Sequence, residues 1–124
     1  MSNQIPNPND KKKYDLKERT AKFGEKIIKF CQNLPPNAIN APLICQLVRA
    51  GTSIGANYME ADGAESKKDF RHKIGICKKE SRETKHWVRI LSIAVPELRD
   101  KIQILWEEAR QLNLIFNSIN NKLK

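Results

Sequence analysis

The sequence predicts an all-α protein, folded as an antiparallel up-down-up-down four-helix bundle. The first observation is composition: Leu, Ile, Lys, Glu and Ala are abundant among the 124 residues and there are only five glycines, which favours helices over sheets. The second is periodicity, because apolar residues recur at spacings of three and four in four separate segments. The third is that the breaks between these segments are short, which favours antiparallel neighbours.

We expect residues 1–13 to form a flexible N-terminal tail and residues 14–124 to form a single four-helix-bundle domain. The tail contains two prolines, three asparagines and a run of three lysines, Lys11 to Lys13. Such a composition is poor at nucleating a helix or burying an apolar face. The lysine run either contacts an anionic partner or keeps the tail solvated.

The first helix is expected to begin near Asp15, which can act as its N-cap. Pro35 and Pro36 end it, because the residue before a proline tends to leave the helical region. Its apolar face comprises Leu16, Thr20, Phe23, Ile27, Phe30 and Leu34, widened by Ile28 and Cys31.

The second helix is expected from about Asn40 to Asp62, with Asn40 as its cap. Within it, Gly51 and Gly55 each cost about 1 kcal/mol relative to Ala. Small residues four apart let another backbone approach closely, and that packing can offset the cost; a flexible hinge is the alternative. The inward face comprises Leu43, Leu47, Ala50, Ile54, Tyr58 and Ala61.

The same helix carries a polar line of Arg49, Ser53, Asn57 and Glu60. Arg49 and Glu60 lie about 16 Å apart along the helix axis, so they need partners on a neighbouring helix or on another subunit. The line is therefore either an exposed polar stripe or a hydrogen-bonded seam at a helix or subunit contact.

The third helix is expected to start with the S-x-x-D pattern of Ser66 and Asp69 and to end before Pro96. Its core face comprises Phe70, Ile74, Cys77, Ser81, Thr84, Val88, Leu91 and Val95. About a quarter turn away lies a basic ridge of Lys67, Arg71, Lys78, Arg82, Lys85 and Arg89. The acidic Asp69, Glu80 and Glu83 lie on the far flank, where they are poorly placed to neutralise the ridge from within the helix.

The fourth helix has the clearest periodicity in the chain. Its heptad positions are Leu98, Ile102, Leu105, Ala109, Leu112, Phe116, Ile119 and Leu123. Ile104, Leu114 and Ile115 lie off this seam, and a monomer would leave some of them in water. The surplus apolar residues predict self-association of the bundle, with an interface that includes Ile76, Trp87, Ile90 and Trp106.

No catalytic residue, metal site or cofactor is expected. His72 and His86 lie about 21 Å apart on one helix and cannot share a metal ion within one chain. Glu83 and His86 form a single Glu-x-x-His pair, whereas a di-iron bundle needs two such pairs and two further glutamates. The glycines of the second helix are not a phosphate loop, because neither a preceding strand nor a Gly-Lys-Ser/Thr ending is present.

The net charge of +9 and the pI near 9.6 favour an anionic partner, whether nucleic acid, an acidic protein or an anionic membrane; a solvated basic surface is the alternative. No leader and no apolar run of about 18 residues is seen, so neither secretion nor a membrane span is expected. Cys31, Cys45 and Cys77 form no C-x-x-C pair. Isolated cysteines within helices fit a reducing cytoplasm.

The second helix carries the pattern R-A-x-x-S-I-x-x-N-x-x-E, formed here by Arg49, Ala50, Ser53, Ile54, Asn57 and Glu60. With the S-K-K-D-F start at Ser66 and the E-x-x-x-W run from Glu83 to Trp87, the chain from Asp15 onward resembles the four-helix-bundle proteins encoded in intervening sequences of bacterial 23S ribosomal RNA genes. Ala61 departs from relatives that have Gly after the glutamate. The same fold group includes the accessory variability protein of diversity-generating retroelements.

This resemblance implies a bundle that assembles as a homo-oligomeric ring, commonly a pentamer, with no established enzymatic activity. In the retroelement relatives, the basic ring associates with nucleic acid and with a reverse transcriptase. The role of the intervening-sequence members is largely unknown.

Our leading hypothesis is a non-catalytic nucleic-acid-binding accessory protein whose basic ridge contacts phosphates with little base specificity. The ridge has no interleaved aromatic residues for base stacking. The alternative is a protein-interaction scaffold that docks an acidic partner, for example a reverse transcriptase, with nucleic-acid binding incidental. A third possibility is an enzyme with a polar pocket between subunits at the line from Arg49 to Glu60.

Overall fold

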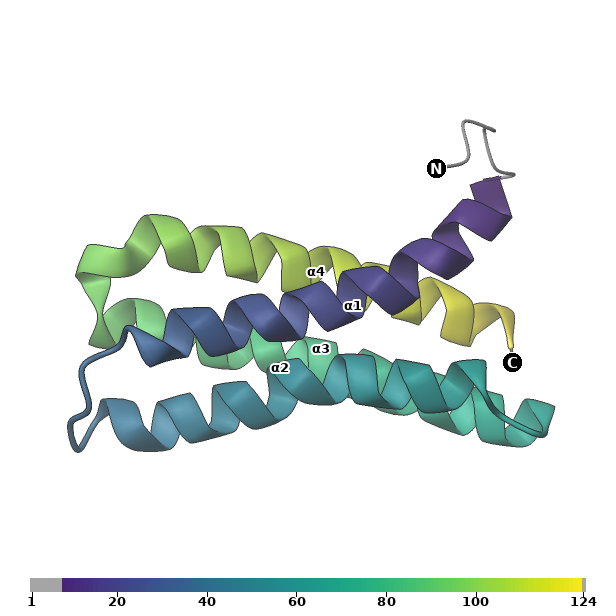
Figure 1. Ribbon diagram of the computed structural model, residues 1–124, viewed down its shortest axis with the longest axis horizontal. Coiled ribbons are helices and arrows are strands. Elements are labelled where there is room, and N and C mark those ends of the chain that lie inside the picture. The colour runs from purple at the N-terminus through teal and green to yellow at the C-terminus, as the bar shows by residue number, and fades with distance from the viewer. Residues whose placement is uncertain (1–7, 124) are drawn as a thin grey trace.

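The computed structural model describes the backbone of residues 8–123 and the side chains of residues 16–123. Over this range the chain forms a helical bundle without a strand. Its elements are α1 (Pro8–Gln32), α2 (Asn40–Asp62), α3 (Lys67–Ala94), the short 3-10 helix η1 (Pro96–Leu98) and α4 (Arg99–Lys122). Figure 1 shows the α1–α2 and α3–α4 connections at one end of the molecule and the α2–α3 connection at the other.

The helix α1 begins at Pro8, earlier than the start expected near Asp15. A proline suits the first turn of a helix, because its fixed φ is helical and its missing N–H would have had no intrahelical partner. Helix α1 thus includes residues 8–13, which had been assigned to the tail. The rest of the predicted tail, residues 1–7, lies outside the described residues.

The core is built from the predicted apolar faces of all four helices. The largest side chains that are at most 1% exposed are Phe23 and Ile27 of α1, Leu47 and Ile54 of α2, Ile74 and Leu91 of α3, and Leu112 and Phe116 of α4. Each contributes about 1.5–3 kcal/mol by leaving water. Toward the end of the bundle where α2 and α4 end, the ring centroids of Tyr58 and Phe116 lie 5.9 Å apart.

The glycines of α2 let α1 approach closely, as predicted. A Cβ atom built on Gly55 would lie 3.3 Å from the backbone of Thr20, and one on Gly51 would lie 2.9 Å from the side chain of Ile27. Helix α2 continues unbroken from Asn40 to Asp62. The glycines therefore serve packing between α1 and α2 rather than a hinge.

The capping residue was predicted correctly for α3 and incorrectly for α2, although α2 begins at Asn40 as expected. The Ser66 hydroxyl accepts a hydrogen bond from the amide of Asp69 at 3.0 Å, as the S-x-x-D pattern predicts. At α2, the side chain of Asn37 caps instead of Asn40, accepting from the amides of Ile39 at 3.0 Å and Asn40 at 2.8 Å. The Asn40 side chain is buried and donates to the carbonyl of Pro35 at 3.0 Å, so it stabilises the preceding loop.

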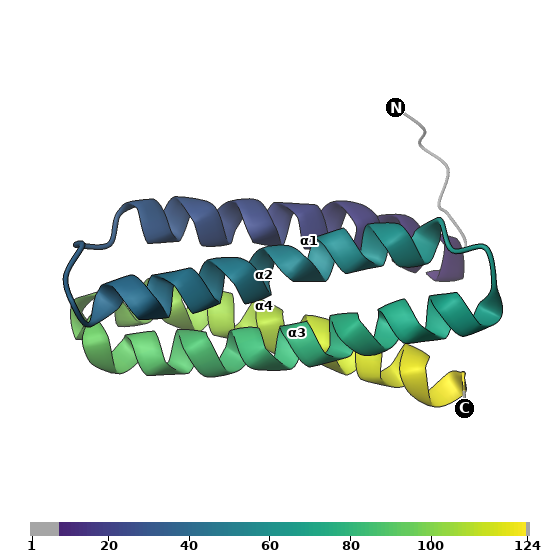
Figure 2. The ribbon, with the colours of Figure 1, turned by 90° about the horizontal axis from the view of Figure 1, so that it is seen from below.

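The helices pack in chain order, α1 on α2, α2 on α3 and α3 on α4, while α1 and α4 meet least (Figure 2). The boundaries between α3 and its two neighbours position the residues of interest. No helix in the described part of the chain combines the length and the apolar character needed to cross a bilayer.

Candidate nucleic-acid interface

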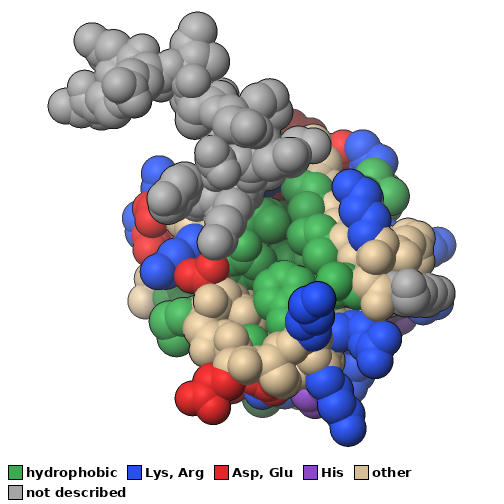
Figure 3. All heavy atoms as spheres, turned by 90° about the vertical axis from the view of Figure 1, so that its right-hand side faces the viewer, with side chains coloured by type: hydrophobic (Ala, Val, Ile, Leu, Met, Phe, Trp, Pro, Cys, Tyr) green, Lys and Arg blue, Asp and Glu red, His purple; other side chains and the backbone are tan. Residues whose placement is uncertain are grey.

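The six cations of the basic ridge all lie on α3, along the side that faces away from α2. Four of them are exposed, Lys67, Arg71, Arg82 and Arg89, whereas Lys78 and Lys85 are half-buried. The core-facing residues of α3, such as Ile74 and Val88, are fully buried. At the end of the molecule where α3 begins, Lys and Arg side chains gather at the right and lower right of the view in Figure 3.

No carboxylate among residues 16–123 forms a salt bridge with any of these six cations. The acidic residues of α3 have other partners: Glu80 and Glu83 bind Arg49 of α2 at 2.9 and 3.4 Å. The amide of Asp69 donates to the Ser66 hydroxyl that caps α3, and its carboxylate forms no salt bridge with the described cations of the ridge. The ridge therefore keeps its positive charge available to an external anion.

The helix beside the ridge supplies polar but uncharged contacts. Asn113 of α4 donates to the carbonyl of Lys78 at 2.9 Å and to the hydroxyl of Ser81 at 3.2 Å. Further along, the guanidinium of Arg71 donates to the carbonyl of Leu123 at 3.3 Å. The sequence contains no Asp or Glu after Glu108. The part of α4 that adjoins the first half of the ridge thus adds no negative charge.

The polar line of α2 is a seam between helices within one chain, at least for its charged members. Arg49 binds Glu80 and Glu83, and Glu60 binds Lys73 of α3 at 3.0 Å. Ser53 and Asn57 instead donate to carbonyls of their own helix, those of Arg49 at 2.6 Å and Ser53 at 2.9 Å. Sequence reasoning missed the partners Glu80 and Glu83, although both stand on the flank of α3 opposite the ridge.

Glu80 is the most deeply buried acid of this seam, with its side chain 8% exposed. Its second carboxylate oxygen, Oε1, is buried without a hydrogen-bond partner among the described residues. Burial and the neighbouring Glu83 raise the pKa of Glu80, against the opposing effect of Arg49. The hydrogen bond with Glu80 and the charge of Arg49 lower the pKa of Glu83. Protonation at this seam therefore favours Glu80 over Glu83.

The described residues offer no further chemistry at this seam. No group of three or more His, Cys, Asp or Glu residues within residues 16–123 is arranged to hold a metal ion. Cys77 adjoins the seam, but its thiol is buried, and burial raises its pKa to about 12. A thiol of this kind is almost entirely protonated at neutral pH and is a poor nucleophile.

The apolar residues predicted at an oligomer interface are half-buried in the single chain: Ile76, Trp87, Ile90 and Trp106. Both tryptophans pack against the core, and the indole N–H of Trp87 is buried without a partner among the described residues. The ring of His86 meets Trp87 edge-on at 4.8 Å. Other apolar side chains are far more exposed, namely Ile39, Met59, Ile93, Ile104 and Leu114.

Comparison with known proteins agrees with the helical bundle. A crystal structure of a protein with unknown function from the S23 ribosomal protein family of Bacteroides thetaiotaomicron is similar to this chain, with 29% sequence identity and a TM-score of 0.80. The similarity covers 89% of this chain and 98% of that one. No curated protein matches the sequence. The sequence profile of the 23S rRNA-intervening sequence proteins matches residues 12–123, so this chain belongs to the 23S rRNA-intervening sequence protein family.

Proposed function

We propose that this protein is a non-catalytic, homo-oligomeric bundle that binds nucleic acid through phosphate contacts along the basic ridge of α3. The observation that carries the proposal is the absence of salt bridges between the ridge and the carboxylates of residues 16–123. A cation that is not engaged within the protein can exchange counterions for phosphates, which is the main source of affinity in non-specific binding.

The dimensions of the ridge suit a nucleic-acid backbone. From Lys67 to Arg89 the helix axis advances by about 33 Å, close to one turn of duplex DNA. Phosphate contacts position a duplex without reading its bases. We therefore propose binding with little sequence preference.

We further propose that the bundle is antiparallel and assembles as a pentameric ring, the assembly that the resemblance to its family implies. The alternating ends at which the connections lie support the antiparallel order. Exposed apolar residues support self-association, above all Ile93, which is 82% exposed. Repetition of the ridge around a ring multiplies weak contacts into higher avidity. We also propose that the protein acts as an accessory to a reverse transcriptase. A reverse-transcriptase gene next to the gene for this protein would support that role.

The test is a salt titration of binding to labelled RNA and duplex DNA of about 30 nucleotides, measured by fluorescence anisotropy beside the mass of the assembly. With four to six phosphate contacts, affinity is expected to fall about 10²–10³-fold between about 50 and 200 mM salt. Unrelated sequences should bind alike. The triple variant Lys78→Glu, Arg82→Glu, Lys85→Glu should abolish binding.

A matched control reverses three exposed lysines of α1, Lys22, Lys26 and Lys29, and so changes the net charge equally. Helix α1 does not pack against α3. This control should retain most of the binding, whereas an equal loss in both triple variants would mean that only net charge matters and would contradict a site on α3.

A further inference from the structure

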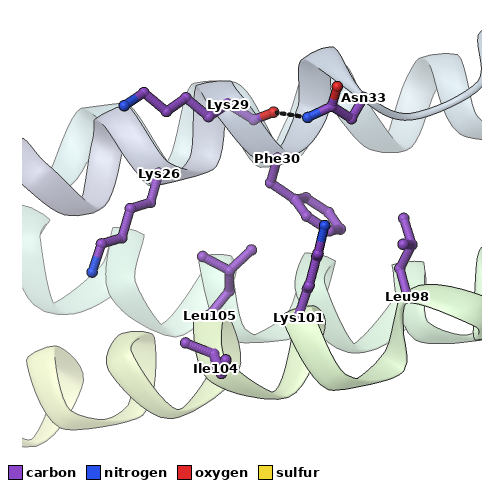
Figure 4. A pocket seen from close by; sticks show the side chains of 8 residues that line it. All are labelled: Lys26, Lys29, Phe30, Asn33, Leu98, Lys101, Ile104 and Leu105. Atoms are coloured by element: carbon purple, nitrogen blue, oxygen red, sulfur yellow. Dashed lines mark hydrogen bonds between the residues drawn. The ribbon is translucent and has the colours of Figure 1, made fainter.

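The boundary between α1 and α4 is open along part of its length. Arg19 of α1 joins the two helices through Glu108, with Nε and Nη2 donating to its carboxylate at 2.7 and 2.8 Å, and through Gln111 at 2.7 Å. From there toward the α1–α2 connection the helices leave a groove of about 320 Å³. Its lining residues are Lys26, Lys29, Phe30, Asn33, Leu98, Lys101, Ile104 and Leu105 (Figure 4).

The groove has an apolar floor between basic edges. Figure 4 shows Phe30 pointing from α1 toward α4, and Leu105 pointing back toward α1. Ile104 is 68% exposed although it adjoins the core residue Leu105. An apolar floor set among polar residues can receive the apolar side chains of a partner.

The three lysines around the floor are available for an anionic partner. Lys26 and Lys101 extend into the space between the helices, while Lys29 lies along α1 (Figure 4). All three are exposed, and none forms a salt bridge with a carboxylate among residues 16–123. The groove therefore combines apolar surface with lysines on both of its walls that form no salt bridge within the described residues.

We infer that this groove docks an amphipathic helix of a partner protein, with apolar residues on one face and Asp or Glu on either side of them. An open groove between two helices accepts the side-chain ridge of a third helix. The carboxylates would meet Lys26 on one wall and Lys101 on the other, while the apolar face covers Ile104. Nucleic acid fits less well, because phosphates would leave the apolar floor uncovered. This inference does not depend on the basic ridge.

The test is a selection from a displayed library of helical peptides of about 16 residues, long enough to span the groove, against the full chain. The enriched peptides should carry apolar residues at spacings of three and four flanked by Asp or Glu. A synthetic peptide of the enriched sequence should lose at least about tenfold in affinity for Ile104→Glu and for Lys26→Glu, Lys101→Glu. The ridge variant Lys78→Glu, Arg82→Glu, Lys85→Glu is the control and should lose less than about threefold.

Three results would overturn the inference. The first is enrichment of peptides without acidic flanks, or binding that survives Ile104→Glu. The second is a smaller assembly mass for Ile104→Glu, which would make the groove a contact between copies of this chain. The third is binding of dodecanoate, but of no peptide, in the groove. Nucleic-acid binding is measured on the same variants, so that a wrong inference about the groove can be told apart from a wrong proposal about the basic ridge.

Discussion

The boundary between α2 and α3 and the boundary between α1 and α4 both carry basic residues, but the first is closed and the second contains a groove. Between α2 and α3, Arg49 faces Glu80 and Glu83, so the charges are paired and the boundary closes. Between α1 and α4, Arg19 binds Glu108 at one point, whereas Lys26 and Lys101 form no salt bridge with a carboxylate among residues 16–123, and a groove remains beside them. Whether a cation is paired within the fold or stays available to a partner thus depends on whether the facing helix places a carboxylate at its level.

The largest difference between the two regions should appear when an isoleucine is shortened. Ile54 on α2 is fully buried, and Ile54→Ala should lower the free energy of unfolding by about 2–5 kcal/mol, because it leaves a cavity. Ile104 borders the groove at 68% exposure, and Ile104→Ala should change it by less than about 0.5 kcal/mol. Urea denaturation at one fixed protein concentration measures both. A large loss for Ile104→Ala would mean that the groove is filled in the assembled protein.

A smaller difference in stability is expected when the arginine at each boundary, Arg49 or Arg19, is replaced by methionine. Arg49→Met leaves Glu80 buried without its cation and should lower the free energy of unfolding by about 1–2 kcal/mol. Arg19→Met should lower it by less than about 1 kcal/mol, because the side chain of Glu108 is 26% exposed and can be hydrated again. The same denaturation experiment compares the variants.

Adding Glu80→Leu to Arg49→Met serves as the control, since it removes the stranded carboxylate and should restore much of the stability. If the two arginine variants lose stability equally, burial of the partner acid is not what distinguishes the boundaries.

The smallest effect concerns the pKa values of Glu80 and Glu83 at the boundary between α2 and α3. In a carboxyl-detected NMR titration, Glu80 should titrate above 4.5, the ordinary pKa of a glutamate, and Glu83 below it. The stability that Glu80 contributes is present below its ordinary pKa and is lost as pH rises through its raised, folded-state value. The stability that Glu83 contributes is present above the ordinary pKa and is lost as pH falls through its lowered, folded-state pKa. Relative to the native chain, Glu80→Gln should therefore gain stability as pH rises from about 4 to 7; a common midpoint for both acids would refute this account.

Local sequence patterns predicted the helices and their buried faces well. The heptad of α4 and the small residues Gly51 and Gly55 act over one or two turns, so their consequences can be worked out without the tertiary arrangement. The cap at Ser66 is equally local. The cap of α2 was misassigned because Asn37 and Asn40 suit the role equally by type, and only the fold buries Asn40.

The site residues were harder to predict because they depend on which helix faces which. The pattern left open whether Arg49 and Glu60 lie on an exposed stripe or at a contact, and it could not supply Glu80, Glu83 or Lys73 as partners. The exposure of the ridge follows from its position on α3, whereas its freedom from salt bridges depends on α4. The groove could not be foreseen, since the periodicity places Phe30 and Leu105 on the apolar faces of two helices and does not show that part of these faces stays open.

The close contact of α1 with α2 has an effect on the other flank of α1. Gly51 and Gly55 of α2 place no side chain between the two helices, and α1 packs on α2 far more extensively than on α4. A Cβ at Gly55 would crowd the backbone of Thr20, so an alanine there should displace α1. The opening above Leu105 can therefore be altered from the far side of α1, while every residue that lines it stays the same.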